Sequence, residues 1–257
     1  MHNFKKQFGQ NFISDKDLID GIANDANVGC DDIIVEIGAG LGSLTSELAK
    51  RAKFVYSFEI DKDLIGELSK LEKQYDNLKF IFEDFMTFDF NSLKLNKFKV
   101  VANLPYYLTS PIIERFLVLK PESMTIMVQK EVAERLASKP SNSEFGAMSV
   151  IIQHQASVKL TRIVDRSMFT PVPKVDSAVI NIEFNGKNYD KKFAKFVYSC
   201  FTFKRKTLYN NLVKSAKLDL GLIEKIYDKF NIDKNARAEN LSAEDFYNIY
   251  NFILKQN

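Results

Sequence analysis

The chain has 257 residues, of which 46% are hydrophobic, so it can bury a sizeable core and is not a largely disordered protein. Its two cysteines, Cys30 and Cys200, show neither CxxC nor CxxH spacing, which excludes a disulfide framework and a zinc site and favours a reducing compartment. The sequence has neither a signal-peptide core nor a run of about 18 apolar residues, so we expect a cytoplasmic protein without a membrane partner.

Short β-rich runs alternate with helical patterns through the first two thirds of the chain. This alternation predicts a doubly wound α/β sheet, in which parallel strands are joined by helices. Later strands follow one another with less helix between them, so we expect the far edge of the sheet to be antiparallel. The expected strands cover residues 33–37, 54–58, 78–82, 99–102, 124–129, 157–163 and 178–184, and the expected helices 43–51, 62–73 and 110–119.

A polar, turn-forming segment at residues 185–190 interrupts this pattern. Beyond it the periodicity is helical, and Ser242 followed by Asp245 predicts a capping box at the start of the last helix. We therefore expect an α/β domain at 1–186 and a small all-α domain at 187–257. The helices expected in the second domain cover residues 191–201, 206–216, 221–230 and 242–255.

The positive charge of the chain is unevenly distributed. The net charge is +3 overall, but residues 187–257 carry +6 and residues 1–186 carry −3. Eight basic residues and no acidic residue lie between Lys191 and Leu218. This asymmetry predicts that the second domain binds a nucleic acid. The alternative is a solvated helix face with its counter-charges elsewhere in space.

A glycine loop, GAGLG at residues 38–42, lies where a predicted strand ends and a helix begins. Glycine permits positive φ angles and lets the backbone approach a ligand that a Cβ atom would exclude. We expect Gly38 and Gly40 to contact a nucleotide-like cofactor. Nicotinamide dehydrogenases use a related GxGxxG loop, so this signal alone leaves the cofactor open.

Three acidic residues, Glu36, Glu59 and Asp84, lie at the ends of successive predicted strands. Ligands of open α/β sheets bind outside the carboxyl ends of the strands, and Glu59 has the spacing of an acid that binds a ribose diol. Three carboxylates would repel a phosphate-bearing cofactor but tolerate a sulfonium nucleoside. We therefore expect S-adenosylmethionine as cofactor, S-adenosylhomocysteine as product and no metal. The alternative is that these acids cap the following helices.

The segment NLPY at residues 103–106 follows the fourth predicted strand. The side-chain carbonyl of Asn103 and a main-chain carbonyl of the turn, at Leu104, can accept both N–H groups of an exocyclic purine amine and aim its lone pair at a methyl donor. The ring of Tyr106 offers an extruded base a stacking face worth about 1–3 kcal/mol. No strong base is needed, since the amine can lose its proton after methyl transfer.

Five segments match the motifs of one enzyme family: FGQNF at 8–12, the glycine loop at 36–42, NLPY at 103–106, FTPVPKVDS at 169–177 and FKRKTLYNNL at 203–212. In this order they resemble the ribosomal RNA adenine dimethyltransferases, most closely the bacterial small-subunit enzymes. The resemblance implies a Rossmann-like class I methyltransferase sheet with a small all-α C-terminal domain. It also implies dimethylation of two adjacent adenosines near the 3′ end of 16S rRNA, within a 30S subunit or its precursor, by a monomeric enzyme linked to ribosome biogenesis.

The resemblance further implies roles for single residues. Asn103 would touch the cofactor as well as orient the target amine. Phe169 would stack on the target base opposite Tyr106, although core packing explains this residue equally well without the family. For the cofactor, the resemblance implies that Asn11 and Ile13 close over it and that Gly38 and Gly40 contact its methionine part. Glu59 would bind the ribose and Asp84 the adenine amine. For the RNA, we predict that Lys204, Arg205 and Lys206 contact phosphates.

Four alternatives stay open. A resistance methyltransferase acting on large-subunit (23S) rRNA shares the reaction, but the stretch at 203–212 argues against it. A ribosome-assembly or transcription factor could keep the scaffold without catalysis. A DNA adenine methyltransferase would often have a separate target-recognition domain, which we do not find, and a nicotinamide dehydrogenase would leave NLPY and the acidic residues unexplained.

Overall fold

The structure is a computed structural model that describes residues 12–256. These residues form two compact units, one of residues 12–133 and 159–184 and the other of residues 134–158 and 185–256. The break after residue 184 lies beside the domain boundary expected near residue 186. Residues 134–158, which we had assigned to the first domain, instead belong to the second unit, because α6 (Ala147–Gln155) packs against the C-terminal helices.

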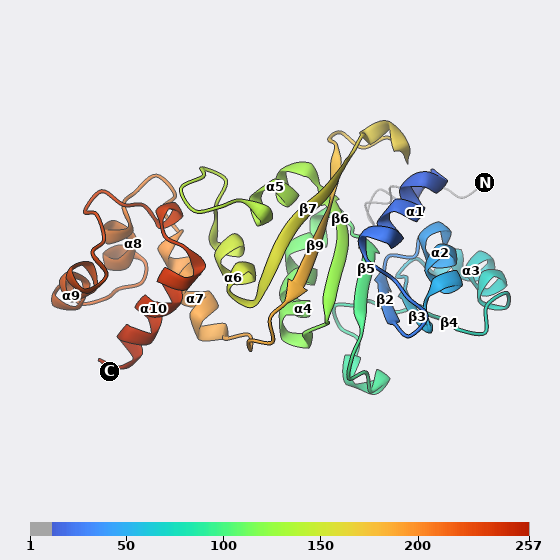
Figure 1. The fold of residues 1–257 in the computed structure, drawn as a ribbon, viewed down its shortest axis with the longest axis horizontal. Helices are drawn as coiled ribbons and strands as arrows, with labels where there is room; N and C mark the ends of the chain where they lie inside the picture. Colours follow the sequence, from blue (N-terminus) through green and yellow to red (C-terminus); the bar gives the residue numbers. More distant parts are fainter. Residues whose placement is uncertain (1–11, 257) are drawn as a thin grey trace. The chain divides into compact units, whose positions relative to one another are not determined.

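A seven-stranded sheet forms the frame of the first unit (Figure 1). Five strands run parallel in the order β4-β3-β2-β5-β6, then β9 pairs antiparallel with β6 and β7 lies at the outer edge. The expected doubly wound sheet with an antiparallel far edge is therefore confirmed. Its strands are β2 (Ile33–Ile37), β3 (Phe54–Phe58), β4 (Leu78–Ile81), β5 (Lys99–Asn103), β6 (Ser123–Gln129), β7 (Ala156–Val164) and β9 (Ser177–Phe184).

Helices connect the parallel strands, as their apolar periodicity predicts. The helix expected at 62–73 is divided into a 3₁₀ turn, Lys62–Leu64, and α3, because the side chain of Asp61 caps the 3₁₀ turn. The strand expected at 99–102 extends to Asn103. The helices that lie wholly or partly in this unit are α1 (Lys16–Asp25), α2 (Ser43–Arg51), α3 (Ile65–Glu72), α4 (Thr109–Leu119) and α5 (Lys130–Ala137).

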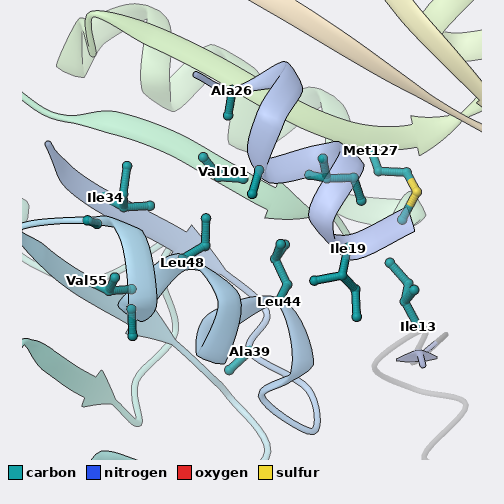
Figure 2. Close-up of a cluster of buried hydrophobic side chains, with 14 of the residues drawn as sticks. Ile13, Ile19, Ala26, Ile34, Ala39, Leu44, Leu48, Val55, Val101 and Met127 are labelled. Carbon is teal, nitrogen blue, oxygen red and sulfur yellow. The ribbon is translucent and has the colours of Figure 1, made fainter. Parts of the chain in front are cut away.

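A hydrophobic core joins α1 and α2 to the sheet (Figure 2). Ile22 of α1 and Leu48 of α2 are fully buried, as are Ile34, Val55 and Val101 on the neighbouring strands β2, β3 and β5. Burial of each such aliphatic side chain contributes about 1.5–3 kcal/mol. This packing fixes the strands in register, so that the segments following their carboxyl ends meet at one edge of the sheet.

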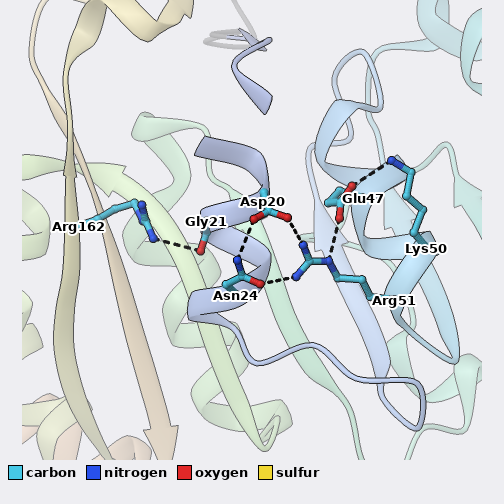
Figure 3. Close-up of polar contacts among 7 residues, drawn as sticks. All are labelled: Asp20, Gly21, Asn24, Glu47, Lys50, Arg51 and Arg162. Atoms are coloured by element: carbon cyan, nitrogen blue, oxygen red, sulfur yellow. Dashed lines mark hydrogen bonds and ion pairs between the residues drawn. The ribbon is translucent and has the colours of Figure 1, made fainter. Parts of the chain in front are cut away.

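Polar contacts at the surface tie α1 to its neighbours (Figure 3). Arg51 of α2 donates to the side chain of Asn24, at 2.7 Å, and pairs with Asp20, both on α1. Arg162 of β7 donates to the main-chain oxygen of Gly21 at 3.3 Å. A Cβ atom on Gly21 would lie 2.8 Å from the guanidinium of Arg162, so an alanine there would displace the end of this side chain. These contacts hold α1 between α2 and the strand β7.

The second unit is helical and consists of α6, α7 (Lys191–Cys200), α8 (Leu208–Lys214), α9 (Leu220–Phe230) and α10 (Ala243–Leu254). Helix α10 packs against α6, α7 and α9, and the unit has its own core of side chains at most 2% exposed. The residues of that core include Phe193, Val197, Leu212, Ile226 and Phe246.

Two helix starts in this unit follow from their capping residues. The predicted capping box is confirmed, since Ser242 Oγ accepts the N–H of Asp245 at 3.1 Å and Asp245 Oδ2 accepts the N–H of Ser242 at 2.8 Å. The helix expected from residue 206 begins instead at Leu208, because the side chain of Thr207 caps it. Residues 204–206 therefore lie in the turn before α8.

Two further observations bear on function. Between residues 12 and 256, no helix combines the length and the apolar composition that a membrane crossing requires. In the same part of the chain, no group of three or more His, Cys, Asp or Glu side chains is arranged to hold a metal ion.

Candidate active site

A hollow of about 1060 Å³, continuous with solvent, opens where the parallel strands end. This is the position at which open α/β sheets bind their ligands. Phe12 and Ile13 contribute to its wall. The other lining residues follow β2, β3, β4 and β5 and include 36–41, 58–60, 83–86 and 103–108. The hollow therefore unites the glycine loop, the acidic strand ends and NLPY.

The glycine loop needs glycine at two of its positions. Gly38 and Gly40 have φ angles of +81° and +57°, a region that strains residues with a Cβ atom. A Cβ atom on Gly40 would lie 2.9 Å from the ring of Phe12, and one on Gly38 would lie 3.6 Å from the main-chain oxygen of Asn103. The backbone of this loop thus closes against two other parts of the wall, and the loop adjoins the NLPY turn (residues 103–106).

Glu59 follows β3 and supports the glycine loop. One carboxylate oxygen accepts the N–H of Gly40 at 2.9 Å, and the other accepts the N–H of Asp61 at 2.8 Å. Its side chain is almost buried, and this burial raises the pKa of Glu59 above the ordinary value. A carboxylate has about four lone-pair sites, and backbone N–H groups occupy three of those of Glu59. Glu59 can therefore hold the loop and accept a ribose hydroxyl at the same time.

Glu36 differs from the charged acid that we expected. Its Oε2 atom accepts hydrogen bonds from the hydroxyls of Thr45 and Ser57, both at 2.6 Å, and the residue is 1% exposed. Burial raises the pKa of Glu36 to about 8, with a smaller contribution from the charge of Glu59. The expectation of three charged carboxylates around the hollow is therefore wrong, because Glu36 is desolvated and holds a proton at neutral pH.

Asp84 lies in the turn after β4, half-buried in the wall of the hollow. Its Oδ1 atom accepts the N–H of Met86 at 2.8 Å, which fixes the orientation of the carboxylate. Its sequence position predicted this location correctly, because the carboxyl ends of parallel strands meet at one edge of the sheet.

The NLPY turn lies at the end of β5. Asn103 is the last residue of the strand and lines the hollow, and the N–H of the buried Leu104 donates to the main-chain oxygen of Met127 at 3.1 Å. The hydroxyl of Tyr106 lies 2.6 Å from the Oγ atom of Ser177 on β9. The neighbouring strands β6 and β9 thus each hold one residue of the turn, while Asn103 and Tyr106 both line the hollow.

The remaining expected site residues lie in the N-terminal segment and at Phe169. Asn11 lies outside the residues that the structure describes. Ile13 lines the hollow but is 7% exposed, and it pairs with Phe169 between β1 (Phe12–Ile13) and β8 (Phe169–Thr170). The ring of Phe169 is 1% exposed within the core and does not line the hollow, which agrees with the alternative of core packing. Its stacking role stays a prediction.

Several residues of the wall were not identified from the sequence, and three of them have exposed, largely apolar side chains. Leu41, Ile60 and Tyr107 are 45%, 42% and 56% exposed, so they present apolar surface to a ligand. Burial of its hydroxyl and the charges of Asp84 and Glu59 raise the pKa of Tyr107, which therefore lies on the side of the hollow with the acids. For Leu41 and Ile60 the sequence signal was an apolar residue directly after a glycine or an acid of the site, whereas Tyr107 directly follows Tyr106.

The predicted RNA contacts Lys204, Arg205 and Lys206 lie in the second unit, in the exposed turn before α8. Asn211, which is 1% exposed, holds the start of this turn: its side chain accepts the N–H of Phe203 at 2.9 Å and donates to the main-chain oxygen of Phe203 at 3.3 Å. The three basic side chains thus project from an anchored backbone. Whether they bind RNA stays a prediction.

The chain matches the family model "Ribosomal RNA adenine dimethylase" over residues 1–255. It belongs to this family. It is 43% identical over 252 residues to "Ribosomal RNA small subunit methyltransferase A" of Clostridium botulinum, which covers 95% of this chain and 91% of that protein. It is 36% identical over 266 residues to the protein of the same name from Pediococcus pentosaceus, with 97% and 89% covered.

Solved structures of similar proteins support the fold of an adenine dimethylase. A dimethyladenosine transferase from Plasmodium falciparum superposes with a TM-score of 0.78 at 27% identity, covering 95% of this chain and 98% of that one. The 23S rRNA methyltransferase ErmE superposes with a TM-score of 0.73, also at 27% identity, covering 94% and 98%. The expected class I methyltransferase sheet is confirmed.

The family also decides the reaction class. A ribosomal RNA adenine dimethylase is an S-adenosylmethionine-dependent methyltransferase, so the expected enzyme class, cofactor and type of nucleic acid are confirmed. A nicotinamide dehydrogenase and a DNA methyltransferase are thereby excluded. The residues of the hollow fit this cofactor, because they combine a glycine cradle that a Cβ atom on Gly40 would fill with exposed apolar surface and acidic groups.

Proposed function

We propose that the hollow binds S-adenosylmethionine and that the enzyme dimethylates the exocyclic amines of two adjacent adenosines near the 3′ end of small-subunit rRNA. The observation that carries this proposal is that the NLPY turn and the glycine loop adjoin at one hollow. The choice of the small subunit is supported by relatives of 43% and 36% identity that are named as small-subunit methyltransferases.

For the cofactor, the proposal assigns one part of the molecule to each wall segment. Glu59 would accept the ribose hydroxyls, and Asp84 would accept the adenine amine. The positive-φ backbone of Gly38 and Gly40 would face the methionine part, and Asn11, with Ile13, would close over it. When bound, S-adenosylmethionine supplies an electrophilic methyl group on a cationic sulfur. The carboxylates of Glu59 and Asp84 suit that positive charge, to which the protonated Glu36 adds nothing.

For the target, the residues of the NLPY turn would hold and orient the base. The side-chain oxygen of Asn103 and the main-chain oxygen of Leu104 would accept the two N–H groups of the amine. The ring of Tyr106, anchored at Ser177, would stack on the base. Alignment of this kind can lower a barrier by about 7–11 kcal/mol. No general base is required, because the amine can lose its proton after methyl transfer. Phe169 would complete the stack only if the β1–β8 pair opened, since its ring is buried.

The second unit would contact the RNA backbone. We propose that Lys204, Arg205 and Lys206 bind phosphates and that residues 187–257 act as the RNA-binding domain of a monomeric enzyme. The exposed positions of the three residues and the net charge of +6 over 187–257 support this role. The substrate would be 16S rRNA within a 30S subunit or its precursor, which keeps the expected location in the cytoplasm and links the enzyme to ribosome biogenesis.

Methylation of isolated subunits tests the proposed substrate. Small and large subunits that lack the modification are incubated with the enzyme and labelled S-adenosylmethionine, and the methylated nucleosides are identified by mass spectrometry. We expect dimethyladenosine in the small subunit. Label confined to the large subunit would support the activity named for ErmE, to which the chain is 27% identical.

The variant Asn103→Ala tests the proposed geometry. It should abolish methylation while RNA binding stays close to that of the wild type, because the side chain is proposed to orient the amine rather than hold the RNA. Full methylation by this variant would refute the geometry. An inactive wild type that still binds small subunits would favour an assembly factor on the same scaffold.

A further inference from the structure

Arg115 on α4 reaches the turn that carries Asp84. Its two terminal nitrogens donate to the main-chain oxygens of Met86 and Phe88. The central carbon of the guanidinium lies 4.7 Å from the centre of the Phe85 ring. Arg115 does not line the hollow. One side chain therefore contacts three of the four residues that follow Asp84.

The turn leaves these two oxygens for Arg115 because its own hydrogen bonds converge on Asp84. Asp84 Oδ1 accepts the N–H of Met86, and the main-chain oxygen of Asp84 accepts the N–H groups of Thr87 at 3.1 Å and Phe88 at 3.0 Å. A half-buried carbonyl without a partner is costly, so the guanidinium stabilises the turn from outside. The orientation of the Asp84 carboxylate thus depends on contacts on both sides of the backbone.

The neighbouring residue of α4 reinforces this arrangement. The ring of Phe116 stacks on Phe85 with 4.9 Å between ring centres, and Phe58, at the end of β3, meets the same ring edge-on at 5.3 Å. Phe85 is 4% exposed. Helix α4 begins directly after the 3₁₀ turn Tyr106–Leu108 that continues NLPY. The helix that follows the target-binding turn therefore also supports the turn that carries Asp84.

A lysine cannot replace this arginine. The two oxygens belong to residues two positions apart, and only a planar guanidinium presents two parallel N–H donors with its face toward an aromatic ring. Burial lowers the pKa of Arg115, and the charges of Asp84 and Asp89 partly offset this, so the group stays charged. An ammonium group at this position would hold one oxygen as a point charge.

We infer that Arg115 is a positioning residue that sets the preference of the enzyme for an adenine nucleoside by holding Asp84 against the 6-amino group. This inference rests on the proposed role of Asp84 in cofactor binding. A nucleoside with an oxygen at that position would face the carboxylate with an acceptor and gain nothing from its orientation. Arg115 should therefore affect cofactor selectivity more than the chemical step.

Calorimetric titration with two probes tests the inference. S-adenosylhomocysteine and its 6-oxo analogue, S-inosylhomocysteine, are titrated into the wild type, Arg115→Lys, Asp84→Asn and the double variant. Arg115→Lys should weaken S-adenosylhomocysteine binding about tenfold, as expected for one lost charge-assisted hydrogen bond, and change the analogue by no more than about twofold. In methylation assays KM for S-adenosylmethionine should rise and kcat should change little.

The double variant distinguishes positioning from general destabilisation. If Arg115 acts through Asp84, its substitution should have no further effect on S-adenosylhomocysteine binding in the Asp84→Asn background. Lys99→Met is a matched control, because Lys99 also holds a main-chain oxygen, that of Asn27 at 2.8 Å, and pairs with Asp32 at 2.7 Å, but at the opposite end of β5. It should lower Tm without changing the ratio of the two affinities.

Two results would overturn the inference: an unchanged ratio in Arg115→Lys, or effects of Arg115→Lys and Asp84→Asn that add in full. If Arg115→Lys does not fold, Arg115→Gln is measured in the same way and judged by the same criteria. A wild type that fails to bind S-adenosylhomocysteine would contradict the proposed cofactor site itself, so the two failures are distinguishable.

Discussion

The hydroxyl of Tyr106 lies 2.6 Å from the Oγ atom of Ser177, which is completely buried at the start of β9. Because β9 pairs with β6, and β6 also accepts the N–H of Leu104 through Met127, the turn is held from one side of the sheet. Burial raises the pKa of Tyr106, with a smaller opposing effect of the Ser177 hydrogen bond, so the phenol stays neutral at physiological pH. The hydroxyl thus anchors the ring and has no role as a base.

Tyr106→Phe should keep the stacking face and lose only the anchor, so we expect kcat to fall by no more than about tenfold, the value of one neutral hydrogen bond. Tyr106→Ala should also lose base stacking, so its kcat should fall by a further factor of about 5 to 150. Ser177→Ala is the matched control and should reproduce Tyr106→Phe. In single-turnover methylation assays the double variant Tyr106→Phe/Ser177→Ala should be no slower than either single variant. Additive losses of rate would contradict an anchoring role.

Gly40→Ala should weaken cofactor binding. The residue has a φ angle of +57°, and the new Cβ atom would meet the Phe12 ring at 2.9 Å, so the loop would have to shift. A left-handed conformation costs a residue other than glycine about 1–2 kcal/mol, which corresponds to a roughly 5- to 30-fold weaker affinity if the bound state requires it. Titration with S-adenosylhomocysteine measures the change.

Gly66 supplies the control for that substitution. It lies within α3, and a Cβ atom there would meet no atom within 4 Å. Gly66→Ala should therefore raise the free energy of unfolding by up to about 1 kcal/mol through helix propensity and leave the affinity unchanged. Equal affinity losses in both variants would show that the backbone conformation of the glycine loop is not what matters.

Glu36→Gln should remove a pH dependence of stability. The pKa of Glu36 is about 8 in the folded protein against an ordinary value of 4.5, so the folded state binds this proton more tightly than the unfolded chain. The stabilisation by the proton is complete below about pH 4.5 and is lost as the pH rises toward about 8. Glutamine stays neutral and can still accept the hydroxyls of Thr45 and Ser57 through its carbonyl oxygen.

The measurement is urea unfolding of both proteins across this pH range. The free energy of unfolding of the variant, relative to the wild type, should rise with pH by up to about 1.4 kcal/mol per pH unit between these limits. Parallel curves for the two proteins would mean that Glu36 is ionised throughout.

Neutralising Lys204, Arg205 and Lys206 together to glutamine should weaken RNA binding without changing its sequence preference. Loss of three phosphate contacts should reduce the slope of log K against log salt by about 2 to 3. Lys225, Lys234 and Lys255, which are also exposed in the second unit, provide a control of equal charge. A control triple variant with the same loss of slope would show that the overall charge, rather than this turn, binds RNA.

The sequence predicted those parts of the site that depend on local pattern. Alternating strands and helices gave the doubly wound sheet, and acidic residues at strand ends led to Glu59 and Asp84, because parallel strands bring their carboxyl ends together. Gly38, Gly40 and Asn103 were found in the same way, from turn chemistry and from position after a strand. These features are encoded within a few residues, so they can be recognised without knowing the rest of the fold.

Only the tertiary structure decided which groups are charged, buried or supported. Glu36 is neutral because folding buries it, which raises its pKa more than the hydrogen bonds from Thr45 and Ser57 lower it, and Phe169 is buried because β8 pairs with β1. Arg115 supports the turn of Asp84 because α4 passes beside it. Desolvation and hydrogen bonding depend on atoms that folding brings together from distant parts of the chain, and no local pattern of residues records them.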